Sequence, residues 1–527
     1  MRSPSFNLAD LFELVSDAEP DREAVVCGSR RLTYGQLRRR AEQVAGALDS
    51  LGVGPGSRVA LALRNGPEYL EVMLGAFWIG AVPVNVNYRY RETELAHVLA
   101  DSSATVLIHE PDLDADLAVV EGKLAADLVT VERGARYETW LAGAPPAPSV
   151  ERSGDDHYLL YTGGTTGTPK GVVWRHEDIF FAAMGGGRRG GEPISRPEEL
   201  LDELSDPPNR VLCASPLMHG TAHWFAFLTL YAGSTVVLSE TTGYDPTALL
   251  DLIDAEEVSY LVLVGDAFAR PLVEAIDSEP DRWDLTSLTL VMSGGATLSA
   301  PTRRSLCDRM PWVLVIDSYG TSETGGQASS VHSAGMVARP GPPRFEMRDH
   351  TAVLDDRLGP VTPGSGTVGR VAKRGHVPLG YLDDPERSAA VFPVVDGVRW
   401  ALTGDQATVD DDGTIVLLGR GSATINSGGE KVHPEEVEAA LVEHPEVLDA
   451  VVVGLPDHRW GEKVAAVVAV RPDETVDTDA LAAHCRERVA GFKVPRDMVV
   501  VERIRRSESG KPDHQWARSR FESQARS

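Results

Sequence analysis

The chain has 527 residues, more than one hydrophobic core usually organises, so two or more domains are expected. Hydrophobic residues make up 42% of the chain and charged residues 24%, the balance of a folded protein rather than a disordered one. A formal net charge of −27 repels phosphodiester backbones and anionic lipid surfaces, so binding to nucleic acid or to a membrane surface is not expected. A small anionic ligand stays compatible with this charge, because a local basic or glycine-rich pocket can override the overall field.

Cysteine usage and the lack of long apolar runs predict a cytoplasmic protein. The N-terminal stretch has no apolar segment of signal-peptide length, and no run of 18 apolar residues occurs, so no membrane span is expected. The oligomeric state is left open, with a dimer as one option. Four dispersed cysteines without a CxxC pair argue against a disulfide framework and a zinc site: Cys27, Cys213, Cys307 and Cys485.

Residues 1–150 alternate helix-like and strand-like patterns. Residues 58–63 predict a buried strand, residues 69–79 an apolar helix and residues 82–85 the next strand. Strand, helix and strand at this spacing predict a parallel sheet covered by helices on both faces. The pattern recurs in short apolar runs at 236–238, 260–264, 288–292 and 313–316.

The remaining segments differ in character. Residues 185–208, rich in glycine, proline and charge, predict an exposed insertion or a mobile loop. Residues 340–418 are rich in turns and alternating strands, as in a small β-barrel-like subdomain. A helix from His433 and a strand at 450–454 predict that residues 423–527 form a small α+β domain. The expected fold is therefore α/β, with a large N-terminal domain of parallel-rich sheets covered by helices.

The strongest chemical signal is a Gly/Thr run that ends in Pro169-Lys170-Gly171. Such a run lets backbone N–H groups and hydroxyls converge on phosphate oxygens, and Lys170 adds a positive charge. It is not a Walker motif, because no Gly-Lys-Ser/Thr follows. The alternative is a flexible linker, against which the Pro-Lys-Gly ending argues. The run contains Thr162, Gly163, Gly164, Thr165, Thr166 and Gly167.

Further motifs follow along the chain. Taken singly, the glycine turn at 293–298 and the Thr-Gly-Asp run at 403–405 are ordinary turns, and a lysine near the C-terminus is usually solvated surface. Their order along the chain makes them informative as a set: Ser293-Gly294-Gly295-Ala296, Asp317-Ser318-Tyr319-Gly320-Thr321-Ser322-Glu323, Thr403-Gly404-Asp405, Leu418-Gly419-Arg420, Ser427-Gly428-Gly429-Glu430 and Ser509-Gly510-Lys511.

These motifs, in this order, resemble the adenylate-forming superfamily, which includes acyl- and aryl-CoA synthetases, luciferases and the adenylation domains of peptide synthetases. The resemblance extends over essentially the whole chain. It implies a ligase that joins a carboxylic acid to AMP and then to coenzyme A, with ATP, Mg²⁺ and coenzyme A as cofactors. It also implies a domain of residues 1–419, a hinge at 420–422 and a mobile C-terminal domain of residues 423–527.

The resemblance gives roles to single residues. Tyr319 would stack on adenine, and Glu323 would hold Mg²⁺, a hard cation that prefers carboxylate and phosphate oxygens. Lys511 would place its ammonium between the α-phosphate and the acid. The other expected contacts are Gly294, Gly295 and Ala296 at adenine, Ser322 at a phosphate, Asp405 and Arg420 at ribose, and Gly428 and Gly429 along the pantetheine arm. Ser318, Gly320 and Thr321, in the same motif as Tyr319, are expected to bind the nucleotide as well.

The match is imperfect at two places. Ser322 stands where the family usually has threonine, and it retains the hydroxyl. The family usually has Asp or Lys two residues after the conserved arginine, as the pivot of domain rotation, and here Ser422 and Ala423 follow Arg420. The pivot is therefore a position at which this chain departs from the family pattern.

The acid is expected to be a large apolar monocarboxylic acid of the fatty, steroid-like or terpenoid class. His219 stands at the family's pocket-gating position, although a hydrogen-bonded core histidine is the alternative. Residues 265–271 resemble actinobacterial synthetases for bulky lipid or steroid side-chain acids. Small residues leave room, and no lysine or aspartate is evident there to pair a charged amine, which disfavours an amino acid. The small residues are Gly220, Gly265, Ala269 and Gly294.

Three other functions remain open at this point. The altered pivot is compatible with an enzyme of one half-reaction, which either adenylates an acid for a carrier protein or thioesterifies a supplied adenylate. A luciferase-like monooxygenase would share the scaffold. A non-catalytic nucleotide- or acyl-binding protein is disfavoured, because the expected functional side chains are all present: Lys170, Glu323, Asp405, Arg420 and Lys511.

Overall fold

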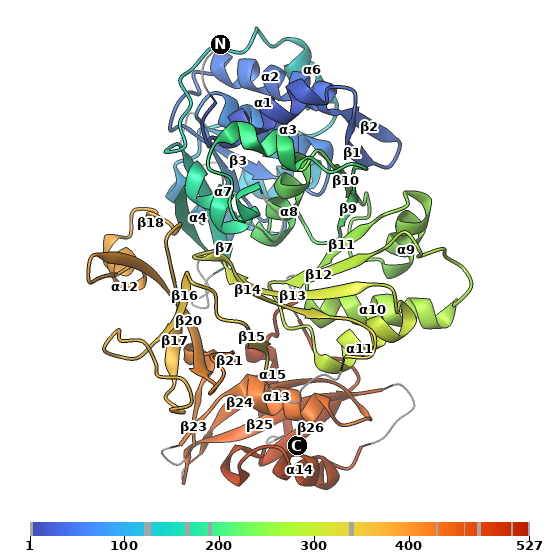
Figure 1. Cartoon of the computed structure of the whole chain (residues 1–527), viewed down its shortest axis with the longest axis vertical. Coiled ribbons are helices and arrows are strands. Elements are labelled where there is room, and N and C mark those ends of the chain that lie inside the picture. Colours follow the sequence, from blue (N-terminus) through green and yellow to red (C-terminus); the bar gives the residue numbers. More distant parts are fainter. Residues whose placement is uncertain are drawn as a thin grey trace.

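The computed structural model describes residues 4–120, 128–163, 169–187, 192–336, 342–427, 430–457, 459–471, 476–506 and 510–524. Four β-sheets organise these residues, two in the upper part of the molecule and two smaller ones below them (Figure 1). Within the described ranges, no helix combines the length and the apolar character that a membrane crossing requires.

The first sheet has seven strands and is mostly parallel, as expected for strands joined by helices. The predicted strands at 58–63 and 82–85 are β3 and β4, and α3 (Pro67–Trp78) connects them. In spatial order the strands are β18 (Gly380–Tyr381), β8 (Pro169–Arg175), β7 (His157–Gly163), β4 (Val82–Asn85), β3 (Arg58–Ala62), β5 (Val106–His109) and β6 (Val129–Glu132).

The second sheet has eight strands, of which only the two edge strands run antiparallel to their neighbours. The four later apolar runs of the sequence lie in β10, β11, β12 and β13. In spatial order the strands are β14 (Gly325–His332), β13 (Leu314–Thr321), β12 (Leu290–Gly294), β11 (Tyr260–Leu263), β9 (Arg210–Cys213), β10 (Thr235–Leu238), β1 (Glu23–Cys27) and β2 (Arg30–Thr33).

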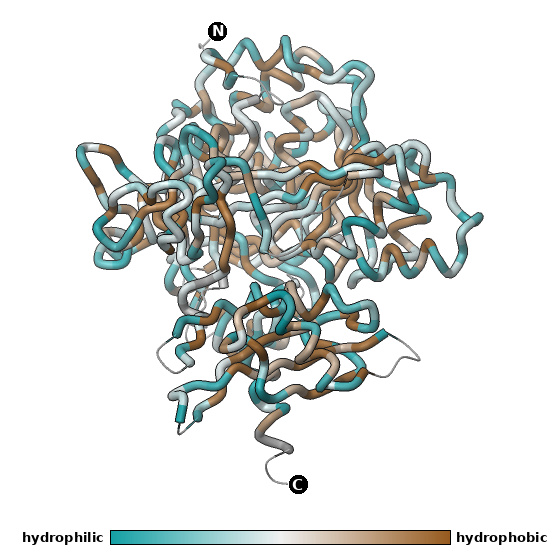
Figure 2. Tube along the Cα trace, turned by 60° about the horizontal axis from the view of Figure 1, so that its bottom comes forward, coloured by the Kyte–Doolittle hydropathy of each residue, from teal (hydrophilic) through white to brown (hydrophobic). Residues whose placement is uncertain are grey.

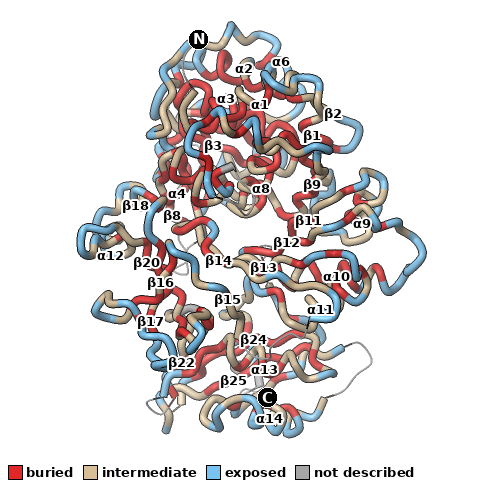
Figure 3. The backbone as a smooth tube through the Cα atoms, viewed as in Figure 1, coloured by how far each residue is buried: buried red, intermediate tan, exposed pale blue. Residues whose placement is uncertain are grey.

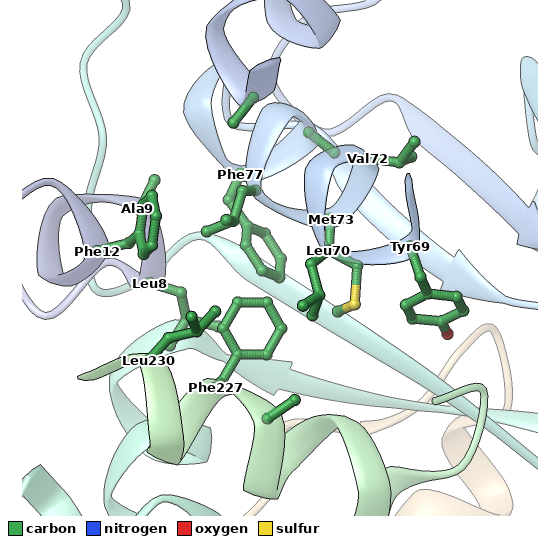
Figure 4. Packing of buried hydrophobic residues seen from close by; sticks show 14 of the residues in the cluster. Leu8, Ala9, Phe12, Tyr69, Leu70, Val72, Met73, Phe77, Phe227 and Leu230 are labelled. Atoms are coloured by element: carbon green, nitrogen blue, oxygen red, sulfur yellow. The ribbon is translucent and has the colours of Figure 1, made fainter. Parts of the chain in front are cut away.

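Helices cover both sheets, and the largest core lies where α1 (Leu8–Ala18), α3 and α8 (Gly220–Tyr231) meet (Figure 3). Phe12, Phe77 and Phe227 gather there (Figure 4), with the rings of Phe77 and Phe227 5.9 Å apart. The other helices of this part are α2 (Tyr34–Ser50), α4 (Glu92–Ser102), η1 (Pro111–Leu113), α5 (Asp114–Val120), α6 (Ala135–Ala142), α7 (His176–Ala183), η3 (Gly185–Gly187), η4 (Pro197–Glu203), α9 (Pro246–Ala255), α10 (Gly265–Ser278) and α11 (Ala300–Arg309).

The third sheet is antiparallel and forms the predicted β-rich subdomain. Residues 403–405 lie inside β20 and not in a turn before a strand, because the run continues the pairing of β20 with β17 and β21. The elements are β15 (Arg344–Phe345), β16 (Thr351–Leu354), β17 (Gly369–Arg374), α12 (Pro385–Val391), β19 (Val394–Val395), β20 (Val398–Val409) and β21 (Ile415–Arg420).

The fourth sheet belongs to the C-terminal part, and the chain enters it between Arg420 and Ile425, at the predicted hinge. Apolar segments run along its inner strands while polar loops surround them (Figure 2). The α/β fold with a small α+β C-terminal part is thus confirmed; rotation at 420–422 stays a prediction. The elements are η5 (Gly421–Ala423), β22 (Ile425–Ser427), β23 (Glu430–Val432), α13 (Pro434–Val442), β24 (Val447–Asp457), β25 (Gly461–Val470), α14 (Thr478–Arg486), η6 (Gly491–Lys493), β26 (Asp497–Val501) and α15 (His514–Gln524).

The prediction of an exposed insertion at 185–208 was wrong for part of the segment. Residues 188–191 lie outside the described residues, but Ile194 and Leu200 are buried, and η4 packs on α1. The prediction failed because it used the average composition of the segment, which is polar and rich in glycine. The few apolar residues are buried because this removes their surface from water.

We expect Phe227→Ala to lower the thermal unfolding midpoint strongly, because removing a fully buried ring leaves a cavity that costs about 3–5 kcal/mol. Differential scanning calorimetry measures the change. Phe492→Ala is the control, since Phe492 is only partly buried, and its midpoint should fall less. Equal losses in the two variants would contradict the packing described for Phe227.

Candidate functional site

A single cavity of about 1260 Å³ brings together residues from three of the four sheets and from the C-terminal part. Its size exceeds the range of about 300–1,000 Å³ that is usual for one small ligand. It therefore has room for two molecules or for one long ligand. The predicted site residues on its wall are Thr162, Lys170, His219, Gly294, Gly295, Ser318, Tyr319, Gly320, Thr321, Ser322, Glu323, Asp405 and Lys511.

Other predicted site residues are not placed on this wall. Gly164, Thr165, Thr166, Gly167, Gly428 and Gly429 lie outside the described residues. Gly163 and Arg420 are described only as strand residues of β7 and β21. Ala296 does not line the cavity; its Cβ would lie 3.3 Å from a Cβ built on Gly510, so it contacts the C-terminal part instead.

Glu323 follows β13, in the turn that leads into β14. The hydroxyl of Tyr381 donates to Oε1 of Glu323 over 2.8 Å, and the backbone N–H of Glu323 donates to Oγ1 of Thr321. The indole N–H of buried Trp174 donates to the carbonyl of Ser322 over 3.0 Å. These bonds fix the direction of a carboxylate that lies partly exposed at the cavity wall.

Tyr319 and Asp405 come from different sheets and meet in the cavity. The hydroxyl of Tyr319 donates to Oδ2 of Asp405 over 2.7 Å, and the ring of Tyr319 lies 5.6 Å from that of Phe345. Asp405 is paired with Arg420 across β20 and β21. An aromatic face next to a carboxylate is a suitable site for a flat base joined to a sugar with vicinal hydroxyls.

The glycine turn after β12 lies beside these residues. Gly294 is the register partner of Ser318 in the parallel pair of β12 and β13, so both reach the cavity from the same sheet edge. Gly295 has a φ of +87°, a left-handed conformation that side chains other than glycine rarely adopt. The turn therefore requires glycine at this position whatever the ligand is.

Lys511 brings the C-terminal part to the cavity mouth. Next to it, Gly510 is buried, and a Cβ built on it would lie 3.3 Å from the carbonyl oxygen of Val264 and from the Cβ of Ala296. The segment therefore passes directly over the start of α10. Lys511 itself is exposed to solvent while it lines the cavity.

A chain of charged groups sets the position of this segment. The Arg506 guanidinium donates to both oxygens of Asp449, over 2.9 and 2.8 Å, and its third nitrogen donates to the carbonyl of Gly510 over 3.0 Å. Arg270 of α10 lies 3.7 Å from Asp449 and also bonds Asp266. This network links the lysine segment to the large N-terminal part.

His219 is the N-cap residue of α8 and lines the cavity. Burial lowers the pKa of His219 to about 4, and the positive charges of Lys511 and Arg89 add to this effect. The imidazole is therefore neutral near pH 7. His223, one turn later, is the hydrogen-bonded core histidine: its ring contacts the hydroxyl of Tyr158 and the carbonyl of Leu217.

The inner part of the cavity is apolar. It lies between one face of the second sheet, represented by Val262, Met292 and Ile316, and helix α8, represented by Trp224 and Leu228. Leu290, at the opposite end of β12 from Gly294, also lines it. The four residue steps between them correspond to about 13 Å along a strand, so the cavity extends deep below the glycine turn.

Four further residues at the site were missed by the sequence analysis. Asn85 donates to the carbonyls of Tyr161 (2.9 Å) and Met218 (2.8 Å) and joins two walls of the cavity. Tyr381 bonds Glu323, and Gln327 and Lys373 line the cavity while fully buried or nearly so. Only Gln327 adjoined a recognised motif; nothing in the sequence marked the other three.

Lys373 of β17 holds the turn between β13 and β14. Its Nζ donates to the carbonyls of Thr324 (2.6 Å) and Gly326 (2.9 Å), on either side of Gly325. Burial lowers the pKa of Lys373 to about 7, and the charge of Arg348 contributes in the same direction. The cavity wall is basic overall despite the acidic chain, with Lys170, Arg348, Lys373, Arg374, Arg387 and Lys511 on it against Glu323 and Asp405.

Comparison with known proteins gives consistent matches over the whole chain. Residues 12–382 match the family described as AMP-binding enzyme, and residues 436–511 match the AMP-binding enzyme C-terminal domain. A 3-oxocholest-4-en-26-oate–CoA ligase of Rhodococcus rhodochrous is 41% identical, with 98% of this chain and 96% of that protein covered. A medium/long-chain-fatty-acid–CoA/3-oxocholest-4-en-26-oate–CoA ligase of Mycobacterium tuberculosis is 42% identical, with the same coverage. A crystal structure of an anthranilate CoA ligase in complex with anthranoyl-AMP superimposes with a TM-score of 0.85 at 26% identity, covering 98% of this chain and 97% of that one.

The pH dependence of stability tests the buried state of Lys373. The folded-state pKa of about 7 lies below the pKa of a lysine in the unfolded chain. Between these two pKa values the folded state binds fewer protons than the unfolded state, so Lys373 makes the free energy of unfolding rise with pH from pH 7 upwards. The thermal midpoint of the wild type minus that of Lys373→Met should therefore increase from pH 7 to pH 9.

Scanning fluorimetry across this pH range measures the effect. Lys463→Met is the matched control, because Lys463 is partly exposed on β25 and forms a surface ion pair with Asp497. Its midpoint difference from the wild type should stay nearly constant. A constant difference for Lys373→Met as well would show that Lys373 is not held in a depressed-pKa state.

Proposed function

Because the chain belongs to the AMP-binding enzyme family and is an AMP-forming acyl-CoA ligase, we propose that it activates a large apolar carboxylic acid, of the steroid side-chain or medium- to long-chain fatty class, and transfers it to coenzyme A. The observation that carries the substrate class is the apolar inner cavity between the second sheet and α8, which extends about 13 Å below the glycine turn. Relatives with names of this substrate class support the same conclusion.

The first half-reaction would take place at the cavity mouth. A carboxylate oxygen of the acid attacks the α-phosphorus of ATP, and the bond to pyrophosphate breaks. Tyr319 and Asp405 would hold the base and the ribose, and the ammonium of Lys511 would neutralise charge on the α-phosphate. Such phosphoryl chemistry depends on positioning and charge stabilisation more than on covalent participation of the protein.

The surroundings of Glu323 fit Mg²⁺. Among the residues described, no group of three or more His, Cys, Asp or Glu side chains could hold a metal by itself. One oriented carboxylate together with phosphate oxygens is the usual way in which proteins hold Mg²⁺ on a nucleotide. We propose that Glu323 supplies this carboxylate; when bound, the cation would neutralise phosphate charge.

The second half-reaction needs the C-terminal part in another position. The thiol sulfur of coenzyme A attacks the acyl carbon, the thiol proton is lost and AMP leaves with the electron pair of the acyl–oxygen bond. Withdrawal of Lys511 by rotation at 420–422 would open the site, with Gly428 and Gly429 along the pantetheine arm. Ser422 and Ala423 lie in the short helix η5 at this boundary.

The acceptor of the acyl group and the cellular compartment are also part of the proposal. Coenzyme A is the acceptor that we propose, and a carrier protein is the alternative that the assay below distinguishes. A luciferase-like oxidation would need molecular oxygen and a light-yielding acid, for which the site supplies no specific support. The proposed compartment is reducing, in keeping with four free cysteine thiols.

The central experiment uses ATP, Mg²⁺, coenzyme A and a panel of fatty, steroid and terpenoid acids, with mass spectrometry of acyl-AMP and acyl-CoA. We expect acyl-CoA, and we expect Lys511→Ala to slow acyl-AMP formation about 100-fold or more, because a charge aimed at the reacting phosphate is removed. Conversion of supplied acyl-AMP to thioester should persist in this variant.

Lys463→Ala serves as the control for lysine loss in the same domain and should retain both half-reactions. Acyl-AMP without acyl-CoA would identify a different acceptor, such as a carrier protein. Thioester formation only from supplied acyl-AMP would reduce the function to the second half-reaction, and loss of both steps in Lys511→Ala would contradict the separate role of this lysine.

The ionic link at the lysine segment predicts a second effect. Arg270→Met removes the contact with Asp449, so the position of the C-terminal part that places Lys511 at the cavity should be less populated. We expect pyrophosphate release in the first half-reaction to slow about 3- to 10-fold, as for loss of a partly buried ion pair, with thioesterification of supplied acyl-AMP unchanged.

Arg282→Met is the matched control, because Arg282 forms its ion pairs with Asp251 and Glu279 at the surface. Single-turnover measurements separate the two half-reactions. An equal loss in both half-reactions for Arg270→Met would indicate damage to α10 and not a change in domain position.

A further inference from the structure

Gln327 is a buried polar side chain whose amide has no protein partner. It is 0% exposed, and neither Oε1 nor Nε2 forms a hydrogen bond with any residue that the structure describes. Leaving such a group unpaired costs about 1–3 kcal/mol, so native proteins rarely contain one without a reason. Gln327 is also one of the residues that line the large cavity.

The backbone around Gln327 turns this residue out of the regular ladder. In the pairing of β13 with β14, Gly320 lies opposite Gly326 and Tyr319 opposite Ala328, so Gln327 is the extra residue of a β-bulge. Its own carbonyl accepts a hydrogen bond from Thr351, which anchors the bulge to the third sheet. Bulges often redirect a side chain towards a binding site.

The position of the amide favours the acid over the nucleotide as its partner. Three of the residues that would hold ATP, namely Tyr319, Glu323 and Lys511, are partly or fully exposed, whereas Gln327 is fully buried. Asp405, which would hold the ribose, is buried but reaches the cavity from the third sheet. Strand β14 also packs on α7, whose residues Phe181 and Ala182 line the cavity. An acid that extends inwards from the mouth would pass this wall.

We propose that Gln327 is a specificity-determining residue that selects acids carrying a hydroxyl or carbonyl oxygen on the part of the acyl chain nearer to the carboxyl group. The proposal rests on the acid-activating function given above. The amide can donate to a carbonyl oxygen and can both donate to and accept from a hydroxyl. An acid without such an oxygen leaves the amide unpaired, which lowers its relative transition-state stabilisation.

The register of the strands places this oxygen on the carboxyl side of the chain. Gln327 lies level with Tyr319 and Gly320, in the last residues of β13, the end of the strand that reaches the reacting groups. The inner end of the cavity is formed instead by Leu290 and Tyr260, at the opposite ends of their strands. A polar group at the far end of the substrate would therefore not reach the amide.

The test compares four acids of equal length: decanoic, 3-hydroxydecanoic, 5-oxodecanoic and 10-hydroxydecanoic acid. The variant is Gln327→Met, which keeps the side-chain length and removes both polar atoms. We expect kcat/KM for at least one of the two acids with an oxygen near the carboxyl group to fall about 10-fold relative to decanoic acid. The ratio for the 10-hydroxy acid should not change, and neither should the KM for ATP.

The thermal midpoint distinguishes a role in substrate selection from a structural role. If the amide stabilised the fold, its removal would lower the midpoint. Because the amide has no partner in the protein, Gln327→Met should leave the thermal midpoint unchanged or raise it. Gln43→Met, the same replacement at an exposed position of α2, is the matched control and should change neither the acid ratios nor the midpoint.

Each other result overturns the inference. A fall of several degrees in the midpoint would show that the amide is bonded within the protein. A raised KM for ATP would assign it to the nucleotide, and an effect confined to the 10-hydroxy acid would place it at the wrong depth. Unchanged ratios with active enzyme would remove this inference alone, whereas no product from any acid in wild type would remove the proposed substrate class together with it.

Discussion

The parallel direction of the strands is the constraint on which the site depends. In the second sheet all inner strands are parallel, and in the first sheet five neighbouring strands are parallel: β7, β4, β3, β5 and β6. The carboxyl ends of parallel strands lie at one edge of a sheet, so the loops that follow them meet. Gly294 and Ser318 are neighbours only because β12 and β13 are parallel and in register. The glycine turn, the acidic turn at Glu323 and the start of α8 therefore surround one cavity although the sequence separates them widely.

The charge at this edge is opposite in sign to the net charge of the chain. The chain carries a net charge of −27, yet the cavity wall has more basic than acidic side chains. Lys373 is buried where its amine holds the turn that carries Glu323, and His219 is neutral because of burial and a nearby lysine. The acidic surface and the basic cavity together favour a small anionic ligand over a polyanion.

The C-terminal part contributes one lysine through a chain of ionic contacts. The carboxylate of Asp449 accepts hydrogen bonds from two nitrogens of Arg506 and lies 3.7 Å from Arg270. This carboxylate therefore links the C-terminal part to α10 of the N-terminal part. These contacts are polar, and the packing of Gly510 against Val264 and Ala296 adds to them. They are compatible with the rotation that two successive half-reactions at one site would require.

The sequence by itself determined the fold class, the main strands and the family. Local patterns suffice for these: residues 82–85 form β4 with the predicted bounds, because a short apolar run with β-branched valines suits a buried strand. It did not identify the buried apolar residues of 185–208, since composition describes a segment on average and Leu200 is buried by α1, a distant helix.

Only the tertiary structure decided which polar residues face the cavity. Lys373, Tyr381 and Asn85 lie far from the recognised motifs in sequence and reach them through strand pairing and hydrogen bonds across sheets. The unpaired amide of Gln327 has no sequence signature, because the number of partners of a side chain depends on every element packed around it. Sequence thus specified the chemistry available to the site, and packing determined its arrangement, since contacts between distant segments exist only in the folded chain.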